Sequence, residues 1–171
     1  MEESAQYLND TACELAAKGH HREAVACLTR ALALAQENPL IWLNLALSQH
    51  ALGEREAAVA SLRASLDRDE GSCDAWDTLG LILNELGETD SAERAYRRAL
   101  DLEPGNARVW NNYGVLAFGQ ERYPQARERF EKAVSLLPAY GDALYNLRDT
   151  YDELGETDKR DACDRILRKL R

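Results

Sequence analysis

The sequence predicts an all-α fold, an α-solenoid of about five antiparallel helix pairs. Three residue types recur at one spacing or at a multiple of it: Gly19, Gly53, Gly87 and Gly155; Trp42, Trp76 and Trp110; Ala24, Ala58, Ala92 and Ala126. Independent residue types that share one register identify an internal repeat, here with a period of about 34 residues. The chain is also rich in alanine and leucine and poor in valine and isoleucine, which favours helices over strands.

The register divides residues 1–171, taken as a single domain, into repeats over 5–38, 39–72, 73–106, 107–140 and 141–171. Each repeat contains two stretches of helical periodicity, which meet near the glycine position. In the first two repeats these stretches meet at Gly19 and Gly53. Glycine suits this place because a helix often ends in a residue with left-handed backbone geometry.

The third repeat shows the elements in detail. Residues 73–86 form its first predicted helix, residues 87–89 the turn and residues 90–102 the second helix, with Thr89 or Asp90 as the N-cap. Pro104 ends this second helix, because proline cannot continue a helix that it does not start. Pro138 ends the corresponding helix of the fourth repeat in the same way.

The second helix of the fifth repeat, predicted over 158–171, differs from its counterparts. Arg160 and Asp164 stand where the other repeats have an alanine and a larger apolar residue. We interpret this helix as a C-terminal cap, because a terminal repeat needs a polar outer face for solubility. Its basic end is explained by the favourable interaction of cations with a helix C-terminus.

These residues resemble the tetratricopeptide-repeat pattern, in which tryptophan, Leu-Gly and tyrosine precede alanine, an aromatic residue and a closing proline. The third repeat matches with Trp76, Leu79, Gly80, Ala92, Tyr96, Ala99 and Pro104, and the fourth with Trp110, Tyr113, Gly114, Ala126, Phe130, Ala133 and Pro138. The resemblance implies a right-handed superhelix of five helix pairs, with the last pair as the cap. It also implies a non-catalytic scaffold that binds another protein or peptide segment in a concave groove.

The net charge, the missing motifs and the histidines disfavour several classes of function. The net charge of −9 disfavours nucleic acid or an anionic membrane as the partner, because both attract basic proteins. The sequence contains no phosphate loop, H-E-x-x-H, G-x-S-x-G or dinucleotide-binding fingerprint. The histidines His20, His21 and His50 lack the second pair of ligands that a metal site needs. We therefore expect no enzyme activity, no cofactor and no metal.

The cysteines and the N-terminal residues predict a reduced, cytoplasmic protein. Cys13, Cys27, Cys73 and Cys163 are widely spaced and form no C-x-x-C pair, so we expect them to pack as small apolar residues. The first twenty residues contain no apolar segment typical of a signal peptide. No apolar run approaches the length of a membrane span.

The resemblance also implies which residues face the groove, namely positions 2, 5, 6, 9, 12 and 13 of each repeat. The predicted partner-binding residues are Leu43, Asn44 and Leu47; Asp74, Asp77 and Leu81; Arg108, Asn111, Asn112, Val115 and Phe118; and Asp142, Tyr145, Asn146 and Asp149. The asparagines at position 6 can pair with a peptide backbone, since the amide both donates and accepts hydrogen bonds. The apolar members form a floor and the acids surround it. We therefore expect an apolar partner segment with basic flanks.

A carboxylate-clamp adaptor, which grips acidic chaperone tails, is disfavoured. Members of that subclass carry lysine and arginine at positions 2 and 6 of the third repeat, where this chain has Asp74 and Thr78. Of the clamp residues, only Asn44 agrees. Two alternatives to a peptide-binding scaffold remain: a self-assembling structural protein that forms a homo-oligomer, and a small acidic secretion-type chaperone.

Overall fold

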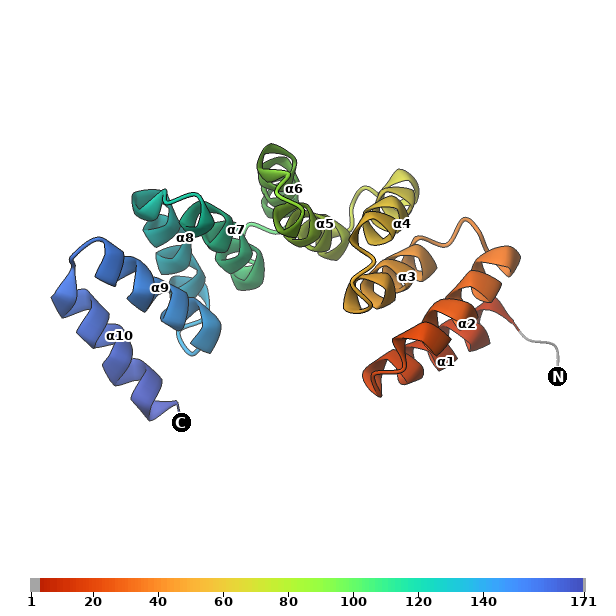
Figure 1. The fold of residues 1–171 in the computed structure, drawn as a ribbon, viewed down its shortest axis with the longest axis horizontal. Coiled ribbons are helices and arrows are strands. Elements are labelled where there is room, and N and C mark those ends of the chain that lie inside the picture. The colour runs from red at the N-terminus through yellow and green to blue at the C-terminus, as the bar shows by residue number, and fades with distance from the viewer. Residues whose placement is uncertain (1–3, 171) are drawn as a thin grey trace. The chain divides into compact units, whose positions relative to one another are not determined.

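A computed structural model describes residues 4–170, which form ten α-helices and no β-strand (Figure 1). The helices are α1 (Ala5–Ala17), α2 (His21–Leu34), α3 (Pro39–Ala51), α4 (Arg55–Arg68), α5 (Cys73–Glu85), α6 (Thr89–Leu102), α7 (Ala107–Gly119), α8 (Tyr123–Leu136), α9 (Gly141–Glu153) and α10 (Thr157–Lys169). Every helix starts exactly one repeat period after its counterpart in the preceding repeat. The all-α fold of consecutive helix pairs is therefore confirmed. Residues 1–3 and 171 of the predicted domain lie outside the described residues.

Helix packing divides the chain into two compact units, Met1–Glu88 (unit 1) and Thr89–Arg171 (unit 2), which we describe separately. In unit 1, α1 to α5 pack on one another in chain order, and α3 also contacts α1 and α5. In unit 2, α6 to α10 do the same, and α7 contacts α9. The first helices of neighbouring repeats thus lie side by side within each unit.

The turn between the two helices of a repeat has one geometry throughout. Its closing bond joins a backbone N–H to the carbonyl five residues earlier, as from His20 to Leu15 at 2.9 Å and from Glu156 to Tyr151 at 2.8 Å. This 6→1 bond is the Schellman motif, which requires a left-handed residue before the donor. Gly19, Gly53, Gly87 and Gly155 supply it with φ between 70° and 81°.

The first helix of each repeat begins at a side-chain cap in four cases. Ser4, Asn38, Ser72 and Asn106 accept hydrogen bonds from backbone N–H groups of the first turn. The second helices lack such a cap where the cap is described. The helix α6 begins at Thr89, so Thr89 and Asp90 are helical residues, and the prediction that one of them is the N-cap is wrong.

The three tryptophans attach the first helices to the preceding loops. The indole N–H of Trp42 donates to the carbonyl of Gln36 at 2.7 Å. Trp76 and Trp110 make the same bond to Glu70 and Pro104, at 2.9 and 2.8 Å. The recurring tryptophan therefore helps to fix where α3, α5 and α7 start.

The core of each unit lies between its helix pairs. In unit 1, one core cluster consists of alanine, leucine and isoleucine of α1, α2 and α3, and α4 and α5 also bury apolar residues. In unit 2 it contains Phe130, Leu144 and Tyr151, which α8 and α9 contribute. Gly114 lies directly against the ring of Phe130, since a Cβ placed on it would come within 2.5 Å of a ring carbon. This contact shows that α7 and α8 approach closely at Gly114.

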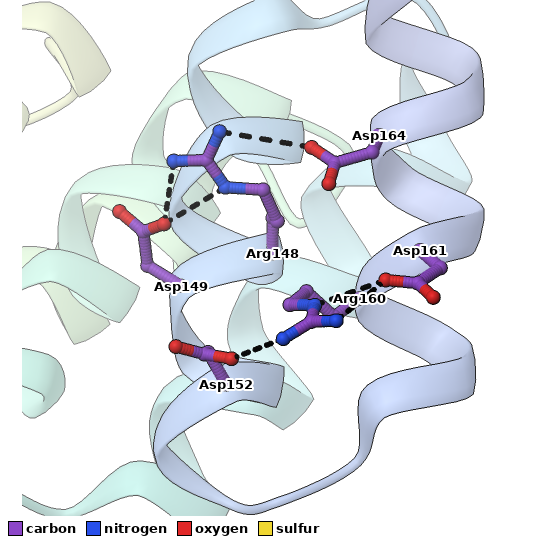
Figure 2. Close-up of polar contacts among 6 residues, drawn as sticks. All are labelled: Arg148, Asp149, Asp152, Arg160, Asp161 and Asp164. Carbon is purple, nitrogen blue, oxygen red and sulfur yellow. Dashed lines mark hydrogen bonds and ion pairs between the residues drawn. The ribbon is translucent and has the colours of Figure 1, made fainter.

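The second helix of the fifth repeat carries Arg160 and Asp164 where its counterparts are apolar. Figure 2 shows the polar contacts of these two residues. Arg160 donates to Asp152 on α9 and to Asp161 on its own helix, both at 2.8 Å. Arg148 on α9 lies 3.7 Å from Asp164 of α10. Ion pairs thus link α9 to α10 on this polar surface, as expected of a capping helix.

Candidate functional site

We call the face that the first helices α1, α3 and α5 present the inner face of unit 1. Among its predicted residues, Leu47 is 45% exposed, and Leu43, Asn44 and Leu81 are partly buried. Asp74 is exposed, whereas Asp77 is buried at 3% exposure. The structure therefore leaves the apolar residues of α3 accessible and places the Asp77 carboxylate out of a ligand's direct reach.

The corresponding inner face of unit 2 is the one that its first helices, α7 and α9, present. Val115 is 39% exposed, and Arg108, Asp142 and Asp149 are exposed. Asn112, Phe118, Tyr145 and Asn146 are partly buried, and Asn111 is buried. This face therefore combines an accessible apolar patch with carboxylates on α9.

Two of the predicted asparagines are held by the preceding first helix. The amide nitrogen of Asn44 donates to the Asn9 carbonyl oxygen at 2.8 Å, and that of Asn146 donates to Asn111 at 2.9 Å. Both bonds join residues 35 positions apart, from position 6 of one repeat to position 5 of the preceding repeat. One N–H donor of each amide is thus used within the protein, and the amide carbonyl oxygen can accept a hydrogen bond from a ligand.

A small pocket opens on the inner face of unit 1, with a volume of about 100 Å³. Its walls come from α1, α2 and α3: Ala12, Cys13, Ala16, His21, Leu28, Asn44, Leu47 and Ser48. Burial and the nearby Asp10 carboxylate raise the pKa of the Cys13 thiol, so it stays protonated near neutral pH. The pocket walls are therefore mostly apolar and contain no carboxylate.

Unit 2 has a pocket of about 70 Å³ between α7, α8 and α9. Its walls are Val115, Phe118, Phe130, Asn146 and Asp149. Four of these five residues belong to the predicted binding set, and the structure brings them together. Phe130 comes from a second helix and was outside that set, although the repeat register relates it to the core residue Leu28.

The two pockets occupy equivalent places in their repeats. Each wall residue of the unit 2 pocket lies three repeat periods after a wall residue of the unit 1 pocket, as Val115 follows Cys13. The pairs differ in chemistry, because Phe118 replaces Ala16 and Asp149 replaces Leu47. The two pockets thus have the same place in the repeat but different wall residues.

Charged groups on these faces are partly paired within the chain. Glu85 of α5 accepts from Arg55 at 2.7 Å and lies 3.0 Å from the His50 ring nitrogen. Burial opposes ionisation of the Glu85 carboxyl, yet the bonds to His50 and Arg55 outweigh it and lower its pKa. In unit 2, both hydrogen bonds from Arg148 to Asp149 end on the same carboxylate oxygen, at 2.6 and 2.9 Å (Figure 2).

A protein-family model described as Tetratricopeptide repeat matches residues 9–72 and 78–141, about three quarters of the chain. The chain belongs to the tetratricopeptide-repeat family. No curated protein matches the sequence.

Solved structures show the same fold. A crystal structure of MamA protein is 23% identical, with a TM-score of 0.79 over 99% of this chain and 91% of that chain. The pilF structure of Pseudomonas aeruginosa is 19% identical, with a TM-score of 0.90 over 98% of this chain and 76% of that chain. MamA from Desulfovibrio magneticus RS-1 is 18% identical, with a TM-score of 0.80 over 99% and 94%. Together with the helix pairs, these likenesses confirm the α-solenoid class.

Membership in this family indicates a protein-interaction scaffold, since tetratricopeptide-repeat proteins are generally non-catalytic and bind other proteins. Within residues 4–170, no group of three histidine, cysteine or acidic side chains is placed to hold a metal ion. None of the helices in that range combines the length and apolar character that crossing a bilayer requires.

Proposed function

We propose that the protein is a scaffold that binds a segment of another protein on the inner faces of its first helices. The observation that carries this proposal is the pair of equivalent pockets, one on each inner face. Exposed apolar residues beside a charged rim are typical of binding surfaces. Leu47 and Val115 are such residues, and each lines one of the pockets.

The partner segment that suits these faces is apolar with basic flanks. Apolar side chains gain about 25 cal/mol per Å² of surface that they bury in the pockets, before the costs of association. Exposed carboxylates such as Asp74, Asp142 and Asp149 attract basic flanks over a range that salt shortens. The held asparagines Asn44 and Asn146 contribute carbonyl acceptors for backbone N–H groups.

The test is a selection of binding peptides from a random displayed library, followed by affinity measurements with variants. Leu47→Asp and Val115→Asp put a carboxylate on the wall of each pocket, and each variant is compared with the same change at a second-helix residue of similar exposure. The matched controls are Leu34→Asp, at 59% exposure, and Leu136→Asp, at 37%. We expect the pocket variants to weaken binding about tenfold or more and the controls to leave it unchanged.

The opposite binding result would place the binding surface on the second helices. Loss of binding in Leu34→Asp and Leu136→Asp, with normal binding in the pocket variants, would remove the inner-face proposal.

Self-assembly is the second candidate, and exposed leucines favour it. Leu34, Leu102 and Leu136 end α2, α6 and α8, and all three are exposed. Apolar side chains exposed at one repeated position can bury surface between copies of the chain. Sedimentation over a range of concentrations measures this directly, because self-assembly gives a mass that rises with concentration.

A further inference from the structure

The unit 2 pocket combines aromatic walls with a carboxylate, and the unit 1 pocket does not. The partly buried Phe118 supplies the accessible aromatic surface and Asp149 the carboxylate, while the Phe130 ring in the wall is fully buried. Its counterpart has Ala16, Leu28 and Leu47 at the same three positions. An aromatic wall beside a carboxylate suits a flat cation, since guanidinium stacks on rings and also hydrogen-bonds to carboxylates.

We propose that the unit 2 pocket binds the guanidinium group of an arginine in the partner segment, between the Phe118 ring and the Asp149 carboxylate. This inference rests on the proposed function and adds a side-chain preference to it. The unit 1 pocket, whose walls contain no carboxylate, takes an apolar side chain of the partner.

The Asp149 carboxylate keeps one oxygen available for such a ligand. Both bonds from Arg148 end on Oδ1. Figure 2 shows the second oxygen of Asp149 turned away from Arg148. A carboxylate has about four lone-pair sites, so Oδ2 can accept from a second guanidinium.

The charges around the pocket favour a cation over an anion. Arg148 is shared between two carboxylates, Asp149 and Asp164, so this group keeps a net negative charge. Tyr123 packs edge-on against Phe118, with ring centroids 5.3 Å apart. Partial desolvation raises the pKa of the Tyr123 hydroxyl, and the carboxylates of Glu153 and Glu121 raise it further, which places two more acids near this rim.

The size of the pocket also agrees with a guanidinium group. The pocket volume of about 70 Å³ exceeds the roughly 10–15 Å³ that one water requires, so the pocket has room for a group of several heavy atoms. A guanidinium group has four heavy atoms. The Asn146 side chain adds an amide carbonyl to the same wall.

The test uses three small probes with short alkyl chains and different head groups: butylguanidinium, butanol and butyrate. Each is titrated into the protein, and the resonances of the Asn146 side-chain amide and the Phe118 ring are followed by nuclear magnetic resonance. We expect butylguanidinium to shift both sets of signals at lower concentration than butanol, and butyrate to leave them in place.

Variants separate the charge effect from a change in shape. Asp149→Asn keeps the shape and removes the charge, and Asp149→Leu reproduces the wall of the unit 1 pocket. We expect both to weaken butylguanidinium binding about tenfold, with butanol binding retained. Leu47→Asp places a carboxylate in the unit 1 pocket and is expected to add a butylguanidinium response at the Asn44 amide. Circular dichroism confirms that each variant is folded.

Two results would overturn the inference while leaving the proposed function intact. Butanol could shift the Asn146 and Phe118 signals as strongly as butylguanidinium, or Asp149→Asn could bind butylguanidinium as well as the natural chain does. Either would make the unit 2 pocket an apolar site. The proposed function fails by a different measurement, when the inner-face variants bind selected peptides normally.

Discussion

Glu121 occupies the left-handed position of the turn between α7 and α8, with φ of 58°. The equivalent residues of the other four repeats are glycines. The turn closes in the same way, because the Arg122 N–H donates to the carbonyl of Ala117 at 3.0 Å. A residue with a Cβ pays about 1–2 kcal/mol for this backbone conformation, so the fourth turn is strained where the others are relaxed.

Replacing Glu121 with glycine should therefore stabilise the protein. The expected gain is about 1 kcal/mol, since relief of the left-handed strain exceeds the added entropy of the unfolded chain. Chemical denaturation measures it as a higher midpoint with an unchanged slope. Gly53→Ala makes the reverse change at φ of 80° and should destabilise by a similar amount. A lower midpoint for Glu121→Gly would refute the strain at this turn.

Gly114 illustrates the opposite use of glycine, to admit a neighbouring side chain. A Cβ at this position would lie 2.5 Å from one Phe130 ring carbon, and Phe130 is fully buried and cannot withdraw. We predict that Gly114→Ala costs about 1–3 kcal/mol by overpacking, although alanine is the better helix former. Thermal denaturation should show the loss.

Gly119, in the last turn of the same helix, is the matched control. A Cβ there meets nothing within 4 Å, so Gly119→Ala should be neutral or stabilising. Equal effects of the two alanine substitutions would show that helix propensity, and not the Phe130 contact, governs Gly114.

At the scale of the element, the first helices α1, α3, α5 and α7 are each held at their start by a side-chain cap. The Ser72 hydroxyl accepts a hydrogen bond from the Ala75 N–H at 3.2 Å and satisfies one of the donors that a helix leaves unpaired. Trp76 of the same helix bonds to the Glu70 carbonyl, so the start of α5 is fixed from two sides.

The effect of removing the Ser72 cap on stability can be predicted in size. Ser72→Ala should destabilise the protein by about 1 kcal/mol, and Ser72→Asn should retain most of the stability, because asparagine is an equally good N-cap. Urea denaturation of the three proteins compares them directly. If Ser72→Asn lost as much as Ser72→Ala, the hydroxyl would have a role other than capping.

On the scale of the whole molecule, helices separated by a loop are joined by charge clusters as well as apolar packing. In unit 2, Glu93 of α6 accepts from the Tyr113 hydroxyl of α7 at 2.8 Å and from Arg97 at 2.7 Å. Arg129 of α8 stacks over the Tyr113 ring, 3.4 Å from its centroid. The cluster around the Glu93 carboxylate therefore joins α6, α7 and α8.

This cluster makes stability depend on pH. The hydrogen bond from Tyr113 and the charges of Arg97, Arg129 and Arg122 hold the pKa of Glu93 below its usual range, against partial burial. A lowered folded-state pKa stabilises the protein above the unfolded value of about 4.3, and this stability is lost as pH falls through the folded-state pKa.

Glu93→Gln should therefore lower the melting temperature at pH 7, and the difference from the natural chain should shrink as pH drops below about 4.3. Thermal melts across this range measure both effects. Glu128→Gln, at an exposed carboxylate of α8, is the control that should change little. A Glu93→Gln deficit that persisted unchanged at low pH would show that the amide disturbs packing and not charge.

The register of the repeat predicted the elements closely and the site only in part. The first helix of the third repeat was expected from residue 73, where α5 begins. The second was expected from residue 90 and begins at Thr89, because a helix's first N–H groups are unpaired and leave no periodic signal. The strained Glu121 turn is visible in sequence as the doubled spacing between Gly87 and Gly155.

The site depended on contacts that the sequence does not display. Asp77 and Asn111 stand at positions predicted to face the groove, yet both are buried. Asn146 donates to Asn111 only because α7 and α9 lie side by side. Phe130 joins the unit 2 pocket from α8, a helix that the groove positions exclude.

The sequence by itself determined the fold class, the period of the repeat and, to within one residue, the bounds of the two helices of the third repeat. These follow from local physics, since helix hydrogen bonds join residues four apart and the apolar period recurs within a few turns. Only the tertiary structure decided which inner-face side chains remain accessible, which are held by neighbours and where the pockets form. Those outcomes depend on the packing of helices from successive repeats, where each side chain's surroundings come from another part of the chain.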